Sequence, residues 1–366
     1  MTSKIVVNNI ESDSGIGSVT FNSDIELGTK NLKGHNLEST GIVTATSFSG
    51  SGASLTSLPA GNLTGTLPAL DGSALTGVGV GTADSINTSG IITATSFVPT
   101  TGQLSHRNII INGAMIVAQR GSSGTTSGYA SVDRFETTYS GTDEAPTQSQ
   151  HTLSSSDNPY AEGFRYSYHV TNGNQTSGAG ASDYVRLRYK AEAQDMANSG
   201  WNYTSASSFI TLSFWVKASV TQTYYVQMRT SDGTNKSYYF PMNLSANTWT
   251  KVTHSIPGHA DISFDNDTNE GIYIAWYPYR GTNNTGSGQD ANQWNDWNGS
   301  TITPDQTTTW YTTNDATFEI TGVQLEVGSV PTPFEHRSYG EELSRSQRYY
   351  YQFEIFPNQV VNFLSA

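Results

Sequence analysis

The chain has 366 residues, a formal net charge of -13 and no cysteine. An acidic chain is a poor partner for nucleic acid or for an anionic membrane surface, and the absence of thiols excludes disulfide frameworks and thiolate metal sites. Neither the opening sequence MTSKIVVNNIESDSG nor any later run is apolar enough for a signal peptide or a membrane span. We therefore expect no nucleic-acid partner, no export signal and no membrane insertion.

Before residue 105 the chain is rich in Gly, Ser and Thr and contains a duplicated segment. Residues 40–48 read TGIVTATSF and residues 89–97 read SGIITATSF, which agree at seven of nine positions. Three phenylalanines are the only aromatic residues of this part, so it has too little apolar mass to close a core of its own. We predict an elongated β shaft in which three chains wind around a common axis, with a trimer core formed by Ile42, Phe48, Ile91 and Phe97.

The composition changes after residue 104, because all seven Trp and all twenty Tyr come later in the chain. This later part is large enough for one all-β domain with a real core. A capping-box pattern, Ser338 followed by Glu341, predicts a short helix near the end. The sequence thus predicts four parts: residues 1–27 before the repeats, the shaft at 28–104, a β-sandwich at 105–335, and a C-terminal helix and tail at 336–366.

Several segments of the third part alternate apolar and polar residues, as strands with one buried face do. In FITLSFWVKAS, residues 209–219, Leu212 and Phe214 share a face, and Ser213 and Lys217 lie opposite. Turn dipeptides separate these segments, which predicts a β-sandwich or jelly roll. The alternation changes phase near Gly322, and a β-bulge there would reconcile the two halves of that strand.

A family resemblance follows from these strings. The GI(V/I)TATSF repeats and NLTGTLPALDGSAL resemble shaft segments of bacteriophage tail fibres, notably those of phages that infect cyanobacteria. RNIIINGAMIVAQRG, VDRF and TGVQLEVGSVPTPFEHRSYGEELSRSQRYY are similar to a module of phage tail-fibre and structural proteins, whose middle is like jelly-roll carbohydrate-binding modules. The resemblance implies a homotrimeric fibre of the virion without catalysis, attached through residues 1–27 to other tail or baseplate proteins.

Catalytic motifs are absent from the sequence, and the seven histidines are dispersed along it. We therefore predict no catalytic residue, no cofactor and no metal ligand. Two alternatives stay open. A glycosidase pair could be drawn from Asp290, Asp296, Asp305 and Asp315, although these residues are typical of solvated loops. Residues 265–271 resemble the start of a calcium loop, but Glu270 occupies the position where glycine is required, which favours an acidic turn.

The best candidate for recognition is the long polar segment 281–309. Indole rings stack on sugar rings, and amide and carboxylate groups bind hydroxyls, so glycan contact is predicted for Trp294, Trp297, Asn292, Asn295, Asp296, Trp310 and Tyr311. A loop folded over its own sheet would use the same residues. The strand face with Tyr273, Tyr277, Tyr279 and Arg280 is a second possible platform, which packing would explain equally well.

These observations predict a non-enzymatic receptor-binding tail fibre, located in the virion, that presents its sandwich to polysaccharide on the host cell surface. Two alternatives remain at this point. One is a head-attached fibre or decoration protein, which differs in what residues 1–27 bind. The other is a tailspike depolymerase, although such spikes carry a long β-helix for which this sequence has neither the length nor the repeats.

Overall fold

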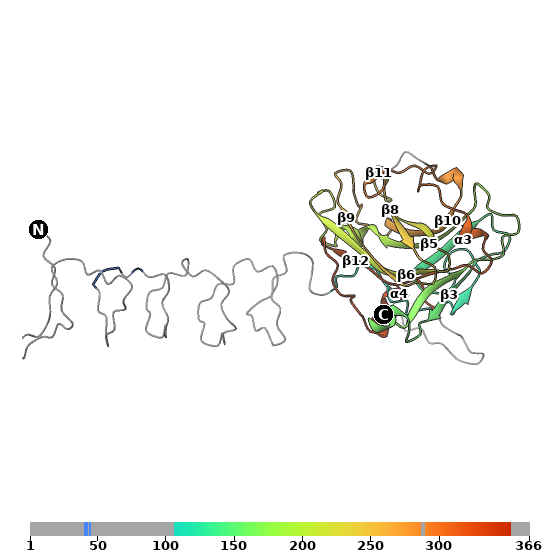
Figure 1. Cartoon of the computed structure of the whole chain (residues 1–366), viewed down its shortest axis with the longest axis horizontal. Helices are drawn as coiled ribbons and strands as arrows, with labels where there is room; N and C mark the ends of the chain where they lie inside the picture. The colour runs from blue at the N-terminus through green and yellow to red at the C-terminus, as the bar shows by residue number, and fades with distance from the viewer. Residues whose placement is uncertain (1–39, 43, 45–105, 287–289, 353–366) are drawn as a thin grey trace, which may run out of the picture. The chain divides into compact units, whose positions relative to one another are not determined.

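The computed structural model describes residues 40–42, 44, 106–286 and 290–352. The chain divides into two units, residues 1–91 and 92–366, and all the described residues except 40–42 and 44 belong to the second. The predicted shaft and residues 1–27 lie outside the described part, apart from those four residues. The described part of the second unit is an all-β sandwich of two antiparallel sheets (Figure 1).

The first sheet has the strand order β1-β3-β4-β12-β6-β9. Its strands are β1 (Ser123–Gly124), β3 (Thr147–Thr152), β4 (Tyr166–Thr171), β12 (Thr317–Val327), β6 (Phe209–Ala218) and β9 (Thr250–Pro257). The second sheet has the order β11-β8-β7-β10-β5-β2. Its strands are β11 (Trp294–Asp296), β8 (Lys236–Leu244), β7 (Gln222–Thr230), β10 (Glu270–Arg280), β5 (Tyr184–Glu192) and β2 (Phe135–Ser140).

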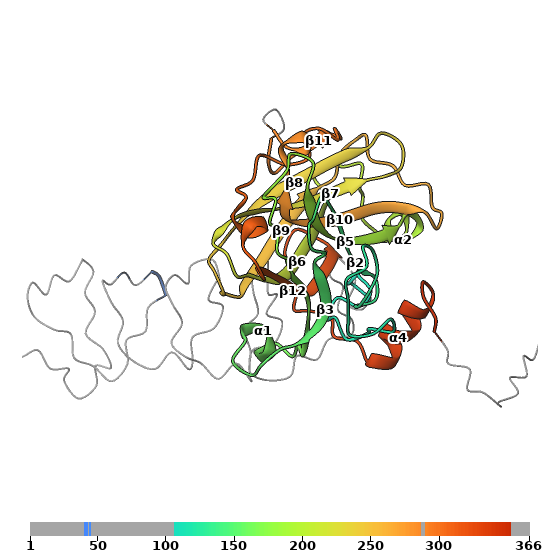
Figure 2. The same ribbon diagram turned by 90° about the vertical axis from the view of Figure 1, so that its right-hand side faces the viewer.

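Short helices lie between and after the strands. They are α1 (Asn158–Ala161), α2 (Ala193–Ala197), the 3-10 turn η3 (Thr282–Asn284), α3 (Thr309–Thr312) and α4 (Tyr339–Gln347). Helices α1 and α4 lie on the side of the first sheet, away from β11 (Figure 2). No helix among the described residues combines the length and the apolar composition needed to cross a membrane.

The two sheets enclose one hydrophobic core, to which alternate residues of each strand contribute. Leu212, Phe214 and Val216 of β6 face Val226 and Trp276 of the second sheet and are at most 1% exposed. The alternation in the sequence therefore identified the buried face of β6 correctly. A second, smaller cluster on the outer side of the first sheet contains Leu153, Phe164 and Trp249. The predicted all-β sandwich with a C-terminal helix is confirmed.

The predicted bulge in β12 is also confirmed. The pairing of β12 with β6 shifts register between Thr321 and Gln324. Gly322 has φ = +63°, and a Cβ placed on it would lie 2.7 Å from the ring of Phe164. Glycine is required at this position for both reasons, and the bulge lets Ile320 and Val323 face the same core.

Strand β10 differs from the sequence prediction at Tyr279. Its pairing with β5 shifts register between Trp276 and Tyr279. Tyr277 consequently packs on the outer side of the second sheet with Tyr273, while Tyr279 turns into the core against Tyr311. Of the possible platform of Tyr273, Tyr277 and Tyr279, the structure therefore turns Tyr279 into the core through the irregularity around Pro278, and it buries Tyr273 and Tyr277 against Ile302, as the packing alternative expects.

The two ends of the described domain meet in a buried polar network. Asn108 donates to the Val323 carbonyl at 3.1 Å and accepts from the amides of Ile110 and Leu325 at 3.0 Å. The Glu342 carboxylate, in α4, accepts from the Asn112 amide at 2.8 Å and pairs with Arg337 at 3.3 Å. Helix α4 begins as predicted, since the Ser338 side chain accepts from the Glu341 amide. Buried polar networks of this kind rigidify the segments that they join.

Replacement of Asn112 tests how much this network contributes to the stability of the fold. Its side chain makes three buried hydrogen bonds of 2.9 Å, to the Val117 carbonyl, the Val117 amide and the Asp133 carbonyl. Asn112→Ala removes all three bonds and should lower the free energy of unfolding by about 2 kcal/mol or more, because the Val117 amide and the Asp133 carbonyl lose this partner while the Val117 carbonyl keeps the Asp133 amide at 3.0 Å. Urea denaturation followed by tryptophan fluorescence measures this change.

Asn247→Ala is the matched control. Asn247 has φ = +57°, close to the +62° of Asn112, but it is exposed. Its replacement carries only the backbone strain, about 1 kcal/mol. Equal losses in the two variants would show that the buried hydrogen bonds of Asn112 contribute little.

Candidate functional site

The outer side of the second sheet carries arginine and tyrosine side chains from three neighbouring strands. Because strand residues alternate between faces, the residues between the core positions of β5, β7 and β10 all point away from the first sheet. We call this surface the arginine–tyrosine face. It consists of Arg186 on β5, Tyr225 and Arg229 on β7, and Tyr273, Tyr277 and Arg280 on β10.

The strand register fixes the pattern of this face. Tyr273 lies opposite Arg229, and Tyr277 lies opposite Tyr225. Between these two pairs, the small Ala275 lies opposite Gln227. The Gln227 side-chain oxygen accepts from the hydroxyl of Tyr277 at 2.7 Å and from that of Tyr273 at 3.3 Å, so it holds both rings in place.

Positive charges on this side of the sheet outnumber the carboxylates that pair with them. Arg188 pairs with Glu136 at 2.5 Å. In contrast, no described carboxylate lies within ion-pair distance of Arg186, Arg229 or Arg280. Their guanidinium groups lie over aromatic rings instead: Arg280 is 5.3 Å from the ring centres of Tyr184 and Tyr277, and Arg229 is 4.0 Å from that of Trp297. Burial lowers the pKa of Arg280, and Arg186 shifts it in the same direction.

Buried polar atoms without a hydrogen-bond partner are concentrated here. Arg280 is 8% exposed, yet its Nε and Nη1 atoms have no protein partner, and neither does Nε of Arg229. The same is true of Trp297 Nε1, Thr303 Oγ1 and both amide atoms of Gln306, in the segment that follows β10. Unpaired buried groups cost free energy, so this set of donors and acceptors is suited to a polar ligand that supplies partners for them.

Among the described residues between β10 and α3, 281–286 and 290–308, a part packs over this face. Ile302 packs on Tyr273, Ala275 and Tyr277 at the centre of the face. Asp305 lies near Tyr225, whose pKa is raised by burial and by that carboxylate. The long loop predicted to carry recognition therefore does lie over an aromatic surface, and the two together form the candidate site.

Trp294, one of the predicted glycan contacts, has a packing role. It belongs to β11 and pairs with Tyr238 of β8. Its indole nitrogen donates to the Pro257 carbonyl at 2.6 Å, and its ring lies edge-on to Tyr238 at 5.4 Å. Replacing Trp294 would thus disturb the edge of the sheet whether or not a glycan binds.

The other predicted residues of this turn divide between structure and surface. Trp297 lies over Arg229 and so borders the arginine–tyrosine face. Asn295 donates to the carbonyls of Asp290 and Gln293, which shapes the turn, and exposed Asn292 adopts φ = +63° there. Asp296 forms an ion pair with Lys236 at 2.7 Å.

Trp310 and Tyr311 were predicted to contact glycan. They lie instead in helix α3 and are completely buried. The indole of Trp310 donates to the Thr317 carbonyl at 3.0 Å, and the Tyr311 hydroxyl donates to the Gly141 carbonyl at 3.1 Å. Neither ring presents a face to solvent, so the structure places both in the core rather than in a binding surface.

Of the four residues predicted to form the shaft core, the structure describes Ile42. Ile42 is 95% exposed in the single chain. Phe48, Ile91 and Phe97 lie outside the described residues. The calcium-like segment forms a turn before β10, in which the Asp267 carboxylate accepts from the amide of Asn269.

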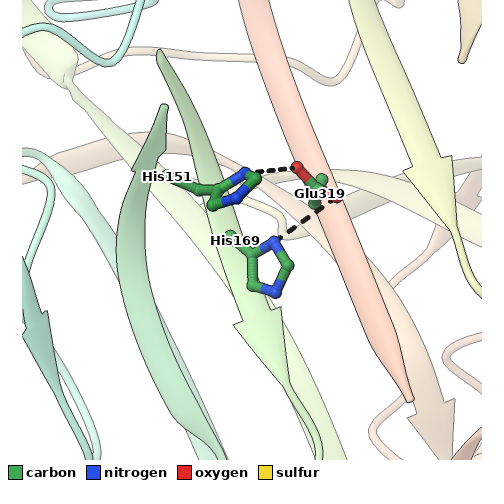
Figure 3. A group of neighbouring side chains, drawn as sticks. All are labelled: His151, His169 and Glu319. Atoms are coloured by element: carbon green, nitrogen blue, oxygen red, sulfur yellow. Dashed lines mark ion pairs between the residues drawn. The ribbon is translucent and has the colours of Figure 1, made fainter. Parts of the chain in front are cut away.

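A second cluster lies on the outer side of the first sheet. His151 of β3 and His169 of β4 both point toward Glu319 of β12 (Figure 3). His151 Nδ1 is 3.4 Å from Oε2 of this carboxylate, and His169 Nδ1 is 3.4 Å from Oε1. Burial alone would raise the pKa of Glu319, but His169 and Lys217 outweigh it and lower the pKa to about 2. No sequence motif indicates this cluster, because its members are far apart along the chain.

Comparisons with known proteins give structural neighbours only. No protein-family model matches the sequence, and no curated protein matches it. Among solved structures, the enzymatically active domain of tailspike protein 4 of bacteriophage CBA120 matches 60% of this chain and 21% of its own length, with a TM-score of 0.32 and 10% identity. The chain thus spans about a fifth of that tailspike protein.

Two smaller neighbours match over nearly their whole length. A putative sugar-binding protein from Bacteroides thetaiotaomicron matches 61% of this chain and 100% of its own, with a TM-score of 0.31 and 12% identity. The TmCBM61 module, solved with β-1,4-galactotriose, matches 61% of this chain and 99% of its own, with a TM-score of 0.28 and 8% identity. At such low identity the likeness concerns the sandwich fold and assigns no residue a role.

Replacing Arg280 of the candidate site and replacing the ion-paired Arg188 beside it should have opposite effects on stability. Arg280→Met removes a buried guanidinium with unpaired nitrogens, so the melting temperature should stay the same or rise, despite a lost cation–π contact of about 1 kcal/mol. Arg188→Met, on the same side of the sheet, leaves Glu136 buried without its closest partner and should cost about 3 kcal/mol. Differential scanning calorimetry compares the two. A large fall in melting temperature for Arg280→Met would mean that Arg280 is structural.

Proposed function

We propose that this chain is a homotrimeric, non-enzymatic tail fibre of a bacteriophage, whose sandwich binds an acidic polysaccharide on the host cell surface through the arginine–tyrosine face. In this proposal residues 1–27 attach the fibre to tail or baseplate proteins of the virion. The resemblance of the shaft repeats and of the module beginning at Arg107 supports the phage assignment. The chemistry of the candidate site supports the glycan.

One observation carries the binding proposal. On a chain with a net charge of -13, Arg186, Arg229 and Arg280 share one sheet face without a carboxylate partner among the described residues. A buried cation without a counterion is unfavourable, and a ligand anion would relieve that cost. Guanidinium groups bind carboxylates with two parallel hydrogen bonds, which makes a uronic acid a fitting ligand.

The aromatic residues account for the sugar part of this ligand. The ring of Tyr225 offers an apolar face to the C–H groups of a pyranose, whereas Tyr273 and Tyr277 are at most 2% exposed and support it from below, with their hydroxyls bonded to Gln227. Tyr225 is only partly buried, and the unpaired atoms of Thr303 and Gln306 lie in the segment above it. A saccharide with several hydroxyls supplies both donors and acceptors for such groups. Threefold display on a trimer would strengthen a weak single-site affinity through avidity.

Titration calorimetry of the full chain with oligogalacturonate and with neutral dextran tests the ligand class. The acidic oligomer should bind and dextran should bind at least tenfold more weakly. Arg229→Met and Tyr225→Ala should each weaken binding of the acidic oligomer at least tenfold, since a charged hydrogen bond or a stacked ring contributes about 1 to 3 kcal/mol. Added salt should weaken binding further.

Lys251→Met is the matched control for charge. Lys251 lies on the outer side of the first sheet, in an exposed pair with Glu162 at 2.8 Å, so its removal changes the net charge equally but leaves the proposed site intact. Equal effects of Lys251→Met and Arg229→Met would reduce the binding to bulk charge. Release of reducing ends from the polysaccharide would contradict the non-enzymatic assignment and favour a depolymerase.

The trimer is tested separately. Analytical ultracentrifugation of the full chain should give about three times the 39.5 kDa chain mass. Ile42→Asp should place three charges in one apolar column, at a cost of several kcal/mol per buried group, and should lower the melting temperature of the trimer. A stable monomer in solution would contradict the intertwined shaft without bearing on glycan binding.

A further inference from the structure

We propose that His151, His169 and Glu319 form a binding site for a divalent transition-metal ion of the zinc type. The three residues stand on three adjacent strands of the first sheet, β3, β4 and β12 (Figure 3). His169 lies directly opposite Glu319 in the register of β4 and β12. His151 is two positions along β3 from Ser149, the partner of His169. The site is therefore built on hydrogen-bonded backbone rather than on a loop.

The distances fit a metal of this size. Each histidine Nδ1 is 3.4 Å from an oxygen of Glu319, and one donor atom from each of the three side chains lies within 4.8 Å of the others. Four-coordinate zinc with bonds of about 2.0 to 2.1 Å holds neighbouring ligand atoms about 3.3 Å apart. His151 is half-exposed, so its ring has room to close the remaining gap, and solvent can reach the fourth position.

The surroundings of His169 and Glu319 orient their donor atoms toward one point. Nδ1 of His169 is buried without a hydrogen-bond partner, whereas its Nε2 lies 3.0 Å from the Thr171 hydroxyl. A metal-bound histidine commonly uses its second nitrogen for such a contact, which fixes the ring. Glu319 is 2% exposed and also accepts from the Ser167 hydroxyl at 2.9 Å. Imidazole with carboxylate selects zinc, cobalt, nickel or copper over calcium and magnesium.

Lys217 is the competing cation at this site. Its ammonium group is 2.8 Å from Glu319, so in the metal-free protein it balances the carboxylate. Lys217 has other contacts available, since Asp157 lies 3.9 Å away and the ring of Trp249 lies 4.8 Å away. A bound metal would share Glu319 with Lys217 or displace it toward these two residues. Removal of Lys217 should therefore strengthen metal binding, which a purely structural ion-pair network does not predict.

The test is calorimetric titration of the full chain with zinc chloride in a buffer that does not bind metal. We expect one ion per chain, with at least tenfold weaker binding in His151→Ala and in His169→Ala, and tighter binding in Lys217→Met. Calcium chloride should not compete. Cobalt chloride should give the visible absorption of a low-symmetry, four-coordinate ion, and that absorption should be lost in His151→Ala.

His259→Ala is the matched control, because His259 lies 3.7 Å from Asp261 in an exposed pair. It should bind zinc like the unchanged protein. Because His151 is half-exposed, His151→Ala should keep the melting temperature of the metal-free protein, which separates lost binding from lost folding. Unchanged zinc affinity in both His151→Ala and His169→Ala would overturn the proposal, as would the absence of any binding to the unchanged chain.

Discussion

The alternation of side chains along the strands is the constraint on which the rest of this structure depends. Once the two sheets bury Leu212, Phe214 and Trp276 between them, the intervening residues face outward wherever the strands are regular. On β5, β7 and β10 these outward residues include arginines and tyrosines, with Gln227 and Ala275 between them. The same register that closes the core therefore assembles the arginine–tyrosine face, and it brings His169 opposite Glu319 on the other sheet.

Much of this fold could be predicted from the sequence, because its information is local. A period of two in residues 209–219, a glycine at the phase change in β12 and a capping box before α4 each depend on neighbouring residues. The sequence predictions failed where a backbone irregularity or a contact between distant residues determines which way a side chain faces. The irregularity around Pro278 turns Tyr279 inward against Tyr311, and helix α3 buries the rings of Trp310 and Tyr311.

The candidate site was predicted in part, for the same reason. Composition identified the long loop after β10 and the ring pair Tyr273 and Tyr277, but not which of its residues face solvent. The indole of Trp294 donates to the Pro257 carbonyl and that of Trp310 donates to the Thr317 carbonyl. No local sequence pattern predicts either contact. The lack of a carboxylate partner for Arg229 and Arg280 is visible only when the described carboxylates near them can be located, which requires the packed structure.

The central claim is that an anionic sugar binds over β7 and β10. A crystal structure of the protein soaked with an oligogalacturonate tests it most directly. The account predicts sugar rings against Tyr225, with a uronate carboxylate within hydrogen-bond distance of the nitrogens of Arg229 or Arg280. Sugar bound elsewhere on the domain, or a face that stays filled by water alone at saturating oligomer, would contradict it.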